Sequence, residues 1–170
     1  MARAGADFVA RFGAPDVVIG NAGVSRGTLT DHAEDLPAFR SVLETNVLGL
    51  VHTFHPFVAP MAAAGGGALV GIASVAGFRG LPGSGAYCAS KSAAITYLES
   101  LRVELRARGV AVLTICPGFI ATPLTARNPY PMPFLIQADD AARRIARAIG
   151  RRKRFSVVPP GMAALSVLLR

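Results

Sequence analysis

One stretch organises the interpretation of this chain: Ser74-Val-Ala-Gly-Phe-Arg-Gly-Leu-Pro-Gly-Ser-Gly-Ala-Tyr87-Cys-Ala-Ser-Lys91. An apolar run ends just before Ser74, a loop rich in glycine and proline follows, and Tyr87 opens an apolar segment typical of a helix. Residues four positions apart share one face of a helix, so we expect Tyr87 and Lys91 to point the same way. A nearby positive charge lowers the pKa of a phenol, which lets a tyrosine exchange protons near neutral pH. Alone, this pattern also fits a packed tyrosine and a solvated lysine, so the rest of the chain has to decide.

Short apolar runs alternate along the chain with longer segments of helical periodicity, which predicts an α/β fold with a parallel sheet. The longest helical segment contains Pro56 and Pro60, which we expect to bend or break it. Asp139 and Asp140 are expected to cap a later helix, because carboxylates favour a helix N-terminus. Residues 119–137, rich in proline, are expected to form a binding loop or lid. The expected strands are residues 16–20, 68–73, 110–116 and 155–158, and the expected helices are residues 2–12, 36–64, 86–108 and 139–149, with another beginning at 162.

Three of the motifs stand just past the ends of expected strands. These are the segments that begin at Asn21, Ser74 and Pro117. In open parallel sheets, ligands bind beyond the carboxyl ends of the strands. The sequence therefore predicts one functional edge at which these motifs meet.

Composition limits the class of protein. The chain has 170 residues, 52% of them hydrophobic, and no linker or repeat divides it, so residues 1–170 are expected to form a single domain. Two cysteines do not make a disulfide framework, and a cytoplasmic location is expected. No uncharged apolar run reaches the roughly 18 residues that would indicate a membrane span. Three histidines without a completing set of carboxylates or cysteines predict no metal site.

The net charge is +8, and much of the excess lies in a basic run between residues 143 and 154. Such a run can mark contact with nucleic acid or an anionic surface. The chain has no tryptophan and only three tyrosines, so the aromatic side chains that often accompany nucleic-acid binding are scarce. We therefore expect a solvated helix face and no nucleic-acid partner.

Taken together, four motifs resemble those of the short-chain dehydrogenase/reductase family over roughly residues 1–160. They are Asn21-Ala-Gly23, Ser74, Tyr87-x-x-x-Lys91 and Pro117-Gly118, in the family's order and at about its spacing. The resemblance implies a three-layer Rossmann-like domain with a parallel sheet, present only in part, with about four strands and the family's first three missing. The family's Gly-rich turn, which places a dinucleotide pyrophosphate at a helix N-terminus, is not found in this sequence.

The resemblance also implies roles for individual residues. Tyr87 would be the general acid/base of hydride transfer, Lys91 would lower its pKa and bind the nicotinamide ribose, and Ser74 would hold the substrate oxygen. Asn46, within Glu44-Thr-Asn-Val47, matches a helix asparagine that anchors a proton-relay water. The residues implied in cofactor binding are Asn21, Ala22, Gly23, Tyr87, Lys91, Pro117, Gly118, Ile120 and Thr122, with either NAD or NADP as the cofactor.

By this resemblance we expect an NAD(P)-dependent oxidoreductase that interconverts a carbonyl and an alcohol by hydride transfer. Aromatic and aliphatic residues in the segment 119–137 suggest a small apolar substrate. Family members pair through two of their helices, which implies a homodimer or tetramer. The alternative is a non-catalytic fragment or pseudoenzyme that cannot hold the cofactor and acts, if at all, through protein association.

Overall fold

Four parallel strands form the centre of the molecule, in the order β1-β2-β3-β6. They are β1 (Val17–Gly20), β2 (Gly67–Ile72), β3 (Val110–Pro117) and β6 (Phe155–Val158). The structure is a computed structural model that describes residues 1–126, 128 and 130–163. Each of the four strands matches one expected from the sequence within one residue at either end. The parallel α/β fold class is therefore confirmed.

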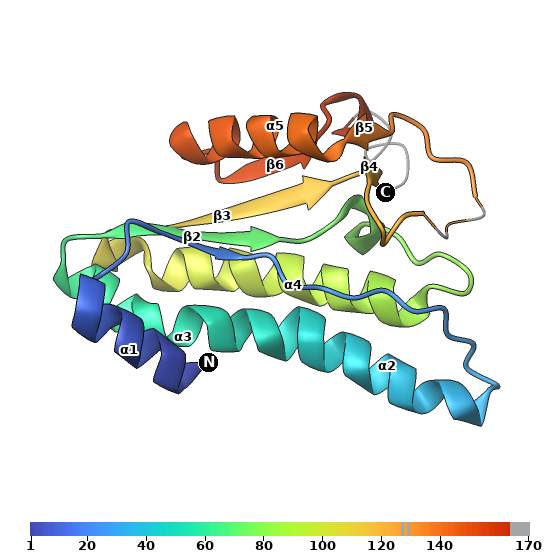
Figure 1. Cartoon of the computed structure of the whole chain (residues 1–170), viewed down its shortest axis with the longest axis horizontal. Coiled ribbons are helices and arrows are strands. Elements are labelled where there is room, and N and C mark those ends of the chain that lie inside the picture. Colours follow the sequence, from blue (N-terminus) through green and yellow to red (C-terminus); the bar gives the residue numbers. More distant parts are fainter. Residues whose placement is uncertain (127, 129, 164–170) are drawn as a thin grey trace.

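Helices cover both faces of this sheet and make three layers (Figure 1). On one face lie α1, α2, α3 and α4, and on the other lies α5. Their bounds are α1 (Ala2–Phe12), α2 (Leu36–Leu43), α3 (Gly49–Ala63), α4 (Gly85–Glu104) and α5 (Ala138–Gly150). The layered, Rossmann-like arrangement agrees with the expectation from the sequence.

Alternation along the strands divides the apolar core into two parts. Leu69 and Val112 face α3 and α4, where they pack with Phe54 and Leu98. Their neighbours Val70 and Leu113 face the opposite way, toward α5. Successive residues of a strand point to opposite faces, so a sheet covered by helices on both sides needs the continuous apolar runs seen in β2 and β3.

The long helix of the middle third differs from its expected form. Both Pro56 and Pro60 lie inside α3, and the helix continues through them. The irregularity lies earlier, where residues Glu44–Leu48 form a π-helical segment between α2 and α3. The ring of Pro56 packs against Gly5 of α1, at a point where a side-chain carbon on Gly5 would overlap it. Tertiary packing thus holds a helix that proline alone would disfavour.

Two smaller expectations need correction, and a third falls mostly outside the described residues. The segment 119–137 is not wholly irregular, because β4 (Ile120–Ala121) pairs in parallel with β5 (Ile136–Gln137) and joins its two ends. The carboxylates of Asp139 and Asp140 lie in the first turn of α5, but neither caps it by a hydrogen bond. Asp140 instead pairs with Arg144, at 2.8 Å between oxygen and nitrogen. Beyond residue 163, the helix expected from 162 lies outside the described residues.

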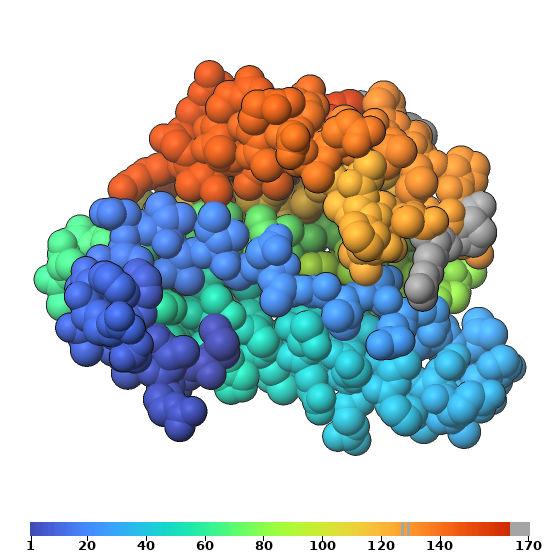
Figure 2. Space-filling model, viewed as in Figure 1, coloured from blue at the N-terminus to red at the C-terminus, as the bar shows by residue number. Residues whose placement is uncertain are grey.

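The sheet has an open edge at β1. Val17 and Ile19 lie on the sheet face that α5 covers elsewhere, and they are 42% and 49% exposed. Val18 points to the other face and is buried against α3. In Figure 2, the segment that follows α1 runs as a blue band across the visible surface, between the orange α5 region and the cyan α2–α3 region. Within the described part of the chain, β1 has a strand partner on one side only.

Candidate active site

The candidate site lies where β1, β2 and β3 end. Ser74 follows β2, Pro117 ends β3, and Asn21 follows β1. Tyr87 lies in the first turn of α4, with Lys91 one turn later. The three strand ends and the start of α4 therefore meet at one edge of the sheet, as the sequence predicted.

Ser74 is held by its own loop. It is 8% exposed, and its hydroxyl accepts a hydrogen bond from the Ala76 N–H at 3.1 Å. The same hydroxyl lies 3.4 Å from the carbonyl oxygen of Pro117, to which it donates. The same hydroxyl is close enough to the Tyr87 side chain to lower the pKa of the phenol. Ser74 thus joins the end of β3 to the start of α4.

Tyr87 has a higher pKa in this chain than an ordinary tyrosine, because burial disfavours its charged form. The nearby Ser74 hydroxyl lowers the pKa of Tyr87 but does not outweigh burial, and Cys88 raises the pKa further. The expectation that Lys91 would leave Tyr87 with a lowered pKa is therefore wrong for the chain as it stands. The neutral phenol is the dominant form near neutral pH, which is the form that donates a proton.

Lys91 points toward Tyr87, and its ammonium lies 5.8 Å from the centre of the tyrosine ring. It is 4% exposed and donates a hydrogen bond to the carbonyl oxygen of Ile72 at 2.9 Å. Burial lowers the pKa of Lys91 to about 8, although Cys116 opposes the shift. The solvated lysine considered from the sequence is thus excluded, since this ammonium is among the most buried charged groups of the chain.

Asn46 lies in the π-helical segment and is 2% exposed. Its side-chain oxygen accepts from the Val24 N–H at 2.8 Å, and its amide nitrogen donates to the Val24 carbonyl and to Ser90 Oγ, each at 2.9 Å. Ser90 in turn donates to the carbonyl of Tyr87 at 2.7 Å. The Asn46 side chain therefore connects the loop after β1 to α4 by hydrogen bonds. Its role in a proton relay stays a prediction.

Sequence reasoning missed Ser90, which is completely buried. Its position could have indicated a place in the site. Ser90 comes three residues after Tyr87, and residues three apart lie on the same face of a helix. A serine inside a helix is also an ordinary surface residue, so the pattern alone did not single it out.

The turn after β1 lies directly against the site. Asn21, Ala22 and Gly23 are exposed. A side-chain carbon on Gly23 would lie 3.3 Å from both Asn46 Oδ1 and Lys91 Nζ. Because Gly23 lacks a Cβ, no side chain at this position fills the space beside the Lys91 ammonium.

The segment after β3 borders the same edge. Gly118 donates its N–H to the carbonyl of Val158 at 2.7 Å, and a side chain there would overlap Met162. Ile120 belongs to the short strand β4, and the N–H of Thr122 donates to Thr125 Oγ1 at 3.1 Å. These residues stand where cofactor contacts are expected, and their roles stay predictions.

Within the described ranges, no group of three or more histidine, cysteine, aspartate or glutamate side chains could hold a metal ion. Cys88 and Cys116 are both buried free thiols. Among the helices that the structure describes, none combines the length and apolarity needed to cross a membrane.

The fold and this set of residues place the chain in a known family. It belongs to the short-chain dehydrogenase family, whose profile, described as short chain dehydrogenase, matches residues 1–131. An uncharacterized oxidoreductase of Myxococcus xanthus is 44% identical over 144 residues, which are 84% of this chain and 56% of the relative. A cis-4-hydroxycyclohexanecarboxylate dehydrogenase of Sinomonas cyclohexanicum is 33% identical and covers 92% of this chain and 60% of its own length. The chain therefore spans little more than half the length of these relatives.

Solved structures agree on the fold. A short-chain dehydrogenase from Burkholderia cenocepacia, solved with NADP, matches with a TM-score of 0.86 at 24% identity, covering 98% of this chain and 69% of that one. A putative short-chain dehydrogenase/reductase from Burkholderia xenovorans matches with a TM-score of 0.83 at 29% identity, covering 96% and 69%. None of these matches supports the alternative of a non-catalytic fragment.

Proposed function

We propose that this chain carries the proton-transfer machinery of an NAD(P)-dependent oxidoreductase that interconverts a carbonyl and an alcohol. The observation that supports this most directly is the contact of Ser74 with Tyr87, with the buried ammonium of Lys91 on the same helix face. These groups come from two separate elements and converge at the sheet edge where ligands of parallel α/β folds bind. A structural role alone does not account for the burial of a lysine.

In the proposed reaction, the bound nicotinamide supplies or accepts the hydride. For carbonyl reduction, the Tyr87 hydroxyl donates the proton to the substrate oxygen, and Ser74 donates a hydrogen bond to the same oxygen as negative charge develops. The ammonium of Lys91 stabilises the phenolate left behind. The reverse reaction uses the same groups, with the Tyr87 phenolate as the base.

The residues beside the site fit a nicotinamide cofactor in part. The space at Gly23 faces Lys91 Nζ, so a ribose there would be within reach of the ammonium. Solved relatives carry NADP in one case and NADH in a 7α-hydroxysteroid dehydrogenase, so the proposal includes both NAD and NADP. The proposed contacts are those expected from the sequence: Asn21, Ala22, Gly23, Tyr87, Lys91, Pro117, Gly118, Ile120 and Thr122.

The proposed substrate is a small apolar carbonyl compound or alcohol. Leu124, Tyr130 and Phe134 are half or more exposed in the segment that β4 and β5 join at its base. We also propose a cytoplasmic location. We further propose that the protein assembles as a homodimer or tetramer, and the exposed apolar side chains of Leu48 and Val103 on the helical face support this assembly. Light scattering that gives a monomer at micromolar concentration would contradict the assembly.

A chimaera tests the chemistry. The part of the Myxococcus xanthus relative that this chain does not match is joined to this chain, and cofactor binding by the product is measured first. In that protein, Tyr87→Phe should lower carbonyl reduction by about 10²–10⁴-fold while the cofactor still binds, because only the acid/base hydroxyl is lost. Tyr97→Phe, on the same helix, is the matched control and should leave activity unchanged. Equal activity of both variants would refute the proposed role of Tyr87.

A further inference from the structure

A hollow lies on the α5 side of the sheet, between α5 and β6. Its volume is about 180 Å³. A water takes up about 30 Å³ of liquid, so there is room for several waters or for one small polyatomic ion. The lining residues are Arg144, Arg147, Ala148, Arg151, Lys153, Ser156, Val157, Val158 and Pro160, none of which belongs to the candidate active site.

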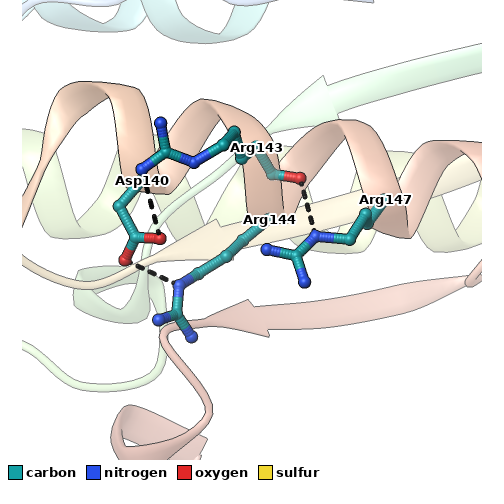
Figure 3. Close-up of polar contacts among 4 residues, drawn as sticks. All are labelled: Asp140, Arg143, Arg144 and Arg147. Atoms are coloured by element: carbon teal, nitrogen blue, oxygen red, sulfur yellow. Dashed lines mark hydrogen bonds and ion pairs between the residues drawn. The ribbon is translucent and has the colours of Figure 1, made fainter.

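Four of these lining residues are cationic, and none is acidic. Figure 3 shows the guanidinium groups of Arg144 and Arg147 on the same side of α5. The Arg144 side chain also pairs with Asp140 at 2.8 Å, which offsets part of one charge. Among the described residues only Arg144 of the four cations has a carboxylate partner, so the hollow keeps an excess of positive charge, which favours an anion.

Ser156 gives an independent indication. Its hydroxyl oxygen is buried and has no hydrogen-bond partner, the only such side-chain atom among the described residues. The side chain lies on the sheet face that α5 covers, since Ser156 is in register with Ile115 of the core on that face. A buried polar atom without a partner is costly and calls for a bound water or ion.

The four basic residues of the turn after α5 line two different hollows. Arg152 has a left-handed backbone, with φ of 48°. Arg151 and Lys153 line the hollow beside Ser156, whereas Arg152 and Arg154 line a crevice along β3. The turn thus places two of its four cationic residues among those that line the hollow with Ser156.

The end of α5 itself works against an anion, because a helix C-terminus carries about half a negative charge. Its last carbonyl groups are occupied, however. Those of Arg147, Ala148 and Ile149 accept hydrogen bonds from the N–H groups of residues 151–153, at 2.8–3.1 Å. The charges of Arg147, Arg151 and Lys153, together with the partly offset charge of Arg144, therefore outweigh the partial charge of the helix end.

We propose that this hollow is a binding site for a phosphate group. The Ser156 hydroxyl donates to one phosphate oxygen, and Arg144, Arg147, Arg151 and Lys153 supply the positive charge. Charge-assisted hydrogen bonds from arginine to phosphate are among the strongest in proteins. The phosphate belongs either to a free phosphate compound or to a phospholipid headgroup, which present the same chemistry to these residues.

Titration of the 170-residue chain with inorganic phosphate and with pyrophosphate, against chloride at equal ionic strength, tests the site. We expect saturable binding of the phosphates and none of chloride. Ser156→Ala should weaken binding about tenfold or more, the usual effect of losing one hydrogen bond to a charged group. Circular dichroism checks that this small substitution leaves the fold intact.

A pair of double variants separates the site from general charge. Arg147→Gln with Arg151→Gln should abolish saturation, whereas Arg3→Gln with Arg40→Gln removes the same charge from α1 and α2 and should change little. The proposal would be overturned if the two double variants lost phosphate binding equally. It would also be overturned if the unaltered chain bound phosphate no more strongly than chloride. Vesicles of phosphatidylcholine with phosphatidic acid distinguish the sources. Binding of these vesicles that depends on Ser156 identifies a headgroup, and binding of free phosphates alone identifies a soluble compound.

Discussion

Asn46 and Ser90 connect the two helical segments that carry the candidate site: the Asn46 amide nitrogen donates to Ser90 Oγ at 2.9 Å. Both residues are buried, and each also bonds the backbone, Asn46 at Val24 and Ser90 at Tyr87. The chain of bonds therefore runs from the loop after β1, through the π-helical segment, to the residue proposed as the proton donor. A side chain with all its polar atoms engaged in this way acts as a positioning group.

Asn46→Ala should destabilise the chain by about 2–4 kcal/mol, because the polar groups of Val24 lose their buried partner. Ser90→Ala should cost about 1 kcal/mol and couple to it, since the two share a hydrogen bond. Urea unfolding of the two single variants and the double variant measures the coupling. Asn128→Ala, in the segment 119–137, serves as the control and should shift stability by about 0.5 kcal/mol or less. Strict additivity of the two site variants would contradict this network.

Lys91 should make stability depend on pH. Its pKa is about 8 in the folded chain and 10.5 in the unfolded one. The unfolded chain therefore binds more protons between these pH values. The loss of folding stability caused by burying the charged ammonium is complete below pH 8 and disappears as the pH rises to 10.5. The advantage of Lys91→Met over the unaltered chain should shrink by about 2–4 kcal/mol between pH 7 and 10.5.

Urea unfolding at a series of pH values checks this, with Lys153→Met as the control at an exposed lysine. Comparing variant with parent cancels the titration of other groups. A difference that stays constant from pH 7 to 10.5 would show that the ammonium is solvated. Lys91→Met also loses the hydrogen bond to the Ile72 carbonyl. This loss lowers the stability of the variant by the same amount at every pH and so leaves the pH dependence of the difference unchanged.

Much of the fold followed from patterns in the sequence. The strands that contain Leu69 and Val112 are continuous apolar runs between helical segments, and such runs predict buried parallel strands. Ser74, Tyr87 and Lys91 were selected because strand ends and helix spacing are local properties and because the motifs together resemble those of a known family. The same local patterns brought Asn21 and Pro117 to the expected edge.

What could not be predicted depends on tertiary contacts. Pro56 predicts a break, but its ring packs on Gly5, and α3 continues. Ser90 looks like any helical serine until Asn46 is placed beside it. The pKa of Tyr87 rises because burial outweighs its polar neighbours, and burial is not a property of the motif.

The open edge at β1 should make the chain associate. Val17 and Ile19 are apolar and exposed on an unpaired edge strand, which favours pairing with another chain. Ile19→Lys should therefore lower the concentration-dependent association of the 170-residue chain, because charge on an edge opposes pairing. Leu36→Lys, at an exposed apolar residue of α2, is the matched control. Light scattering across a concentration series compares the two, and equal association of both variants would place the contact elsewhere.

The 170-residue chain alone should bind NAD(H) and NADP(H) weakly, and the reason is geometric. In the family's fold, a Gly-rich turn places the pyrophosphate at a helix N-terminus, where backbone N–H groups and the helix dipole hold it. This sequence has no such turn, so the contacts left to the cofactor are those near Gly23, Lys91 and Thr122. Calorimetric titration of the soluble chain should show no saturation at low micromolar cofactor. Saturable binding in that range would mean that these residues hold the dinucleotide without a Gly-rich turn. The prediction that tight binding needs such a turn would then be wrong.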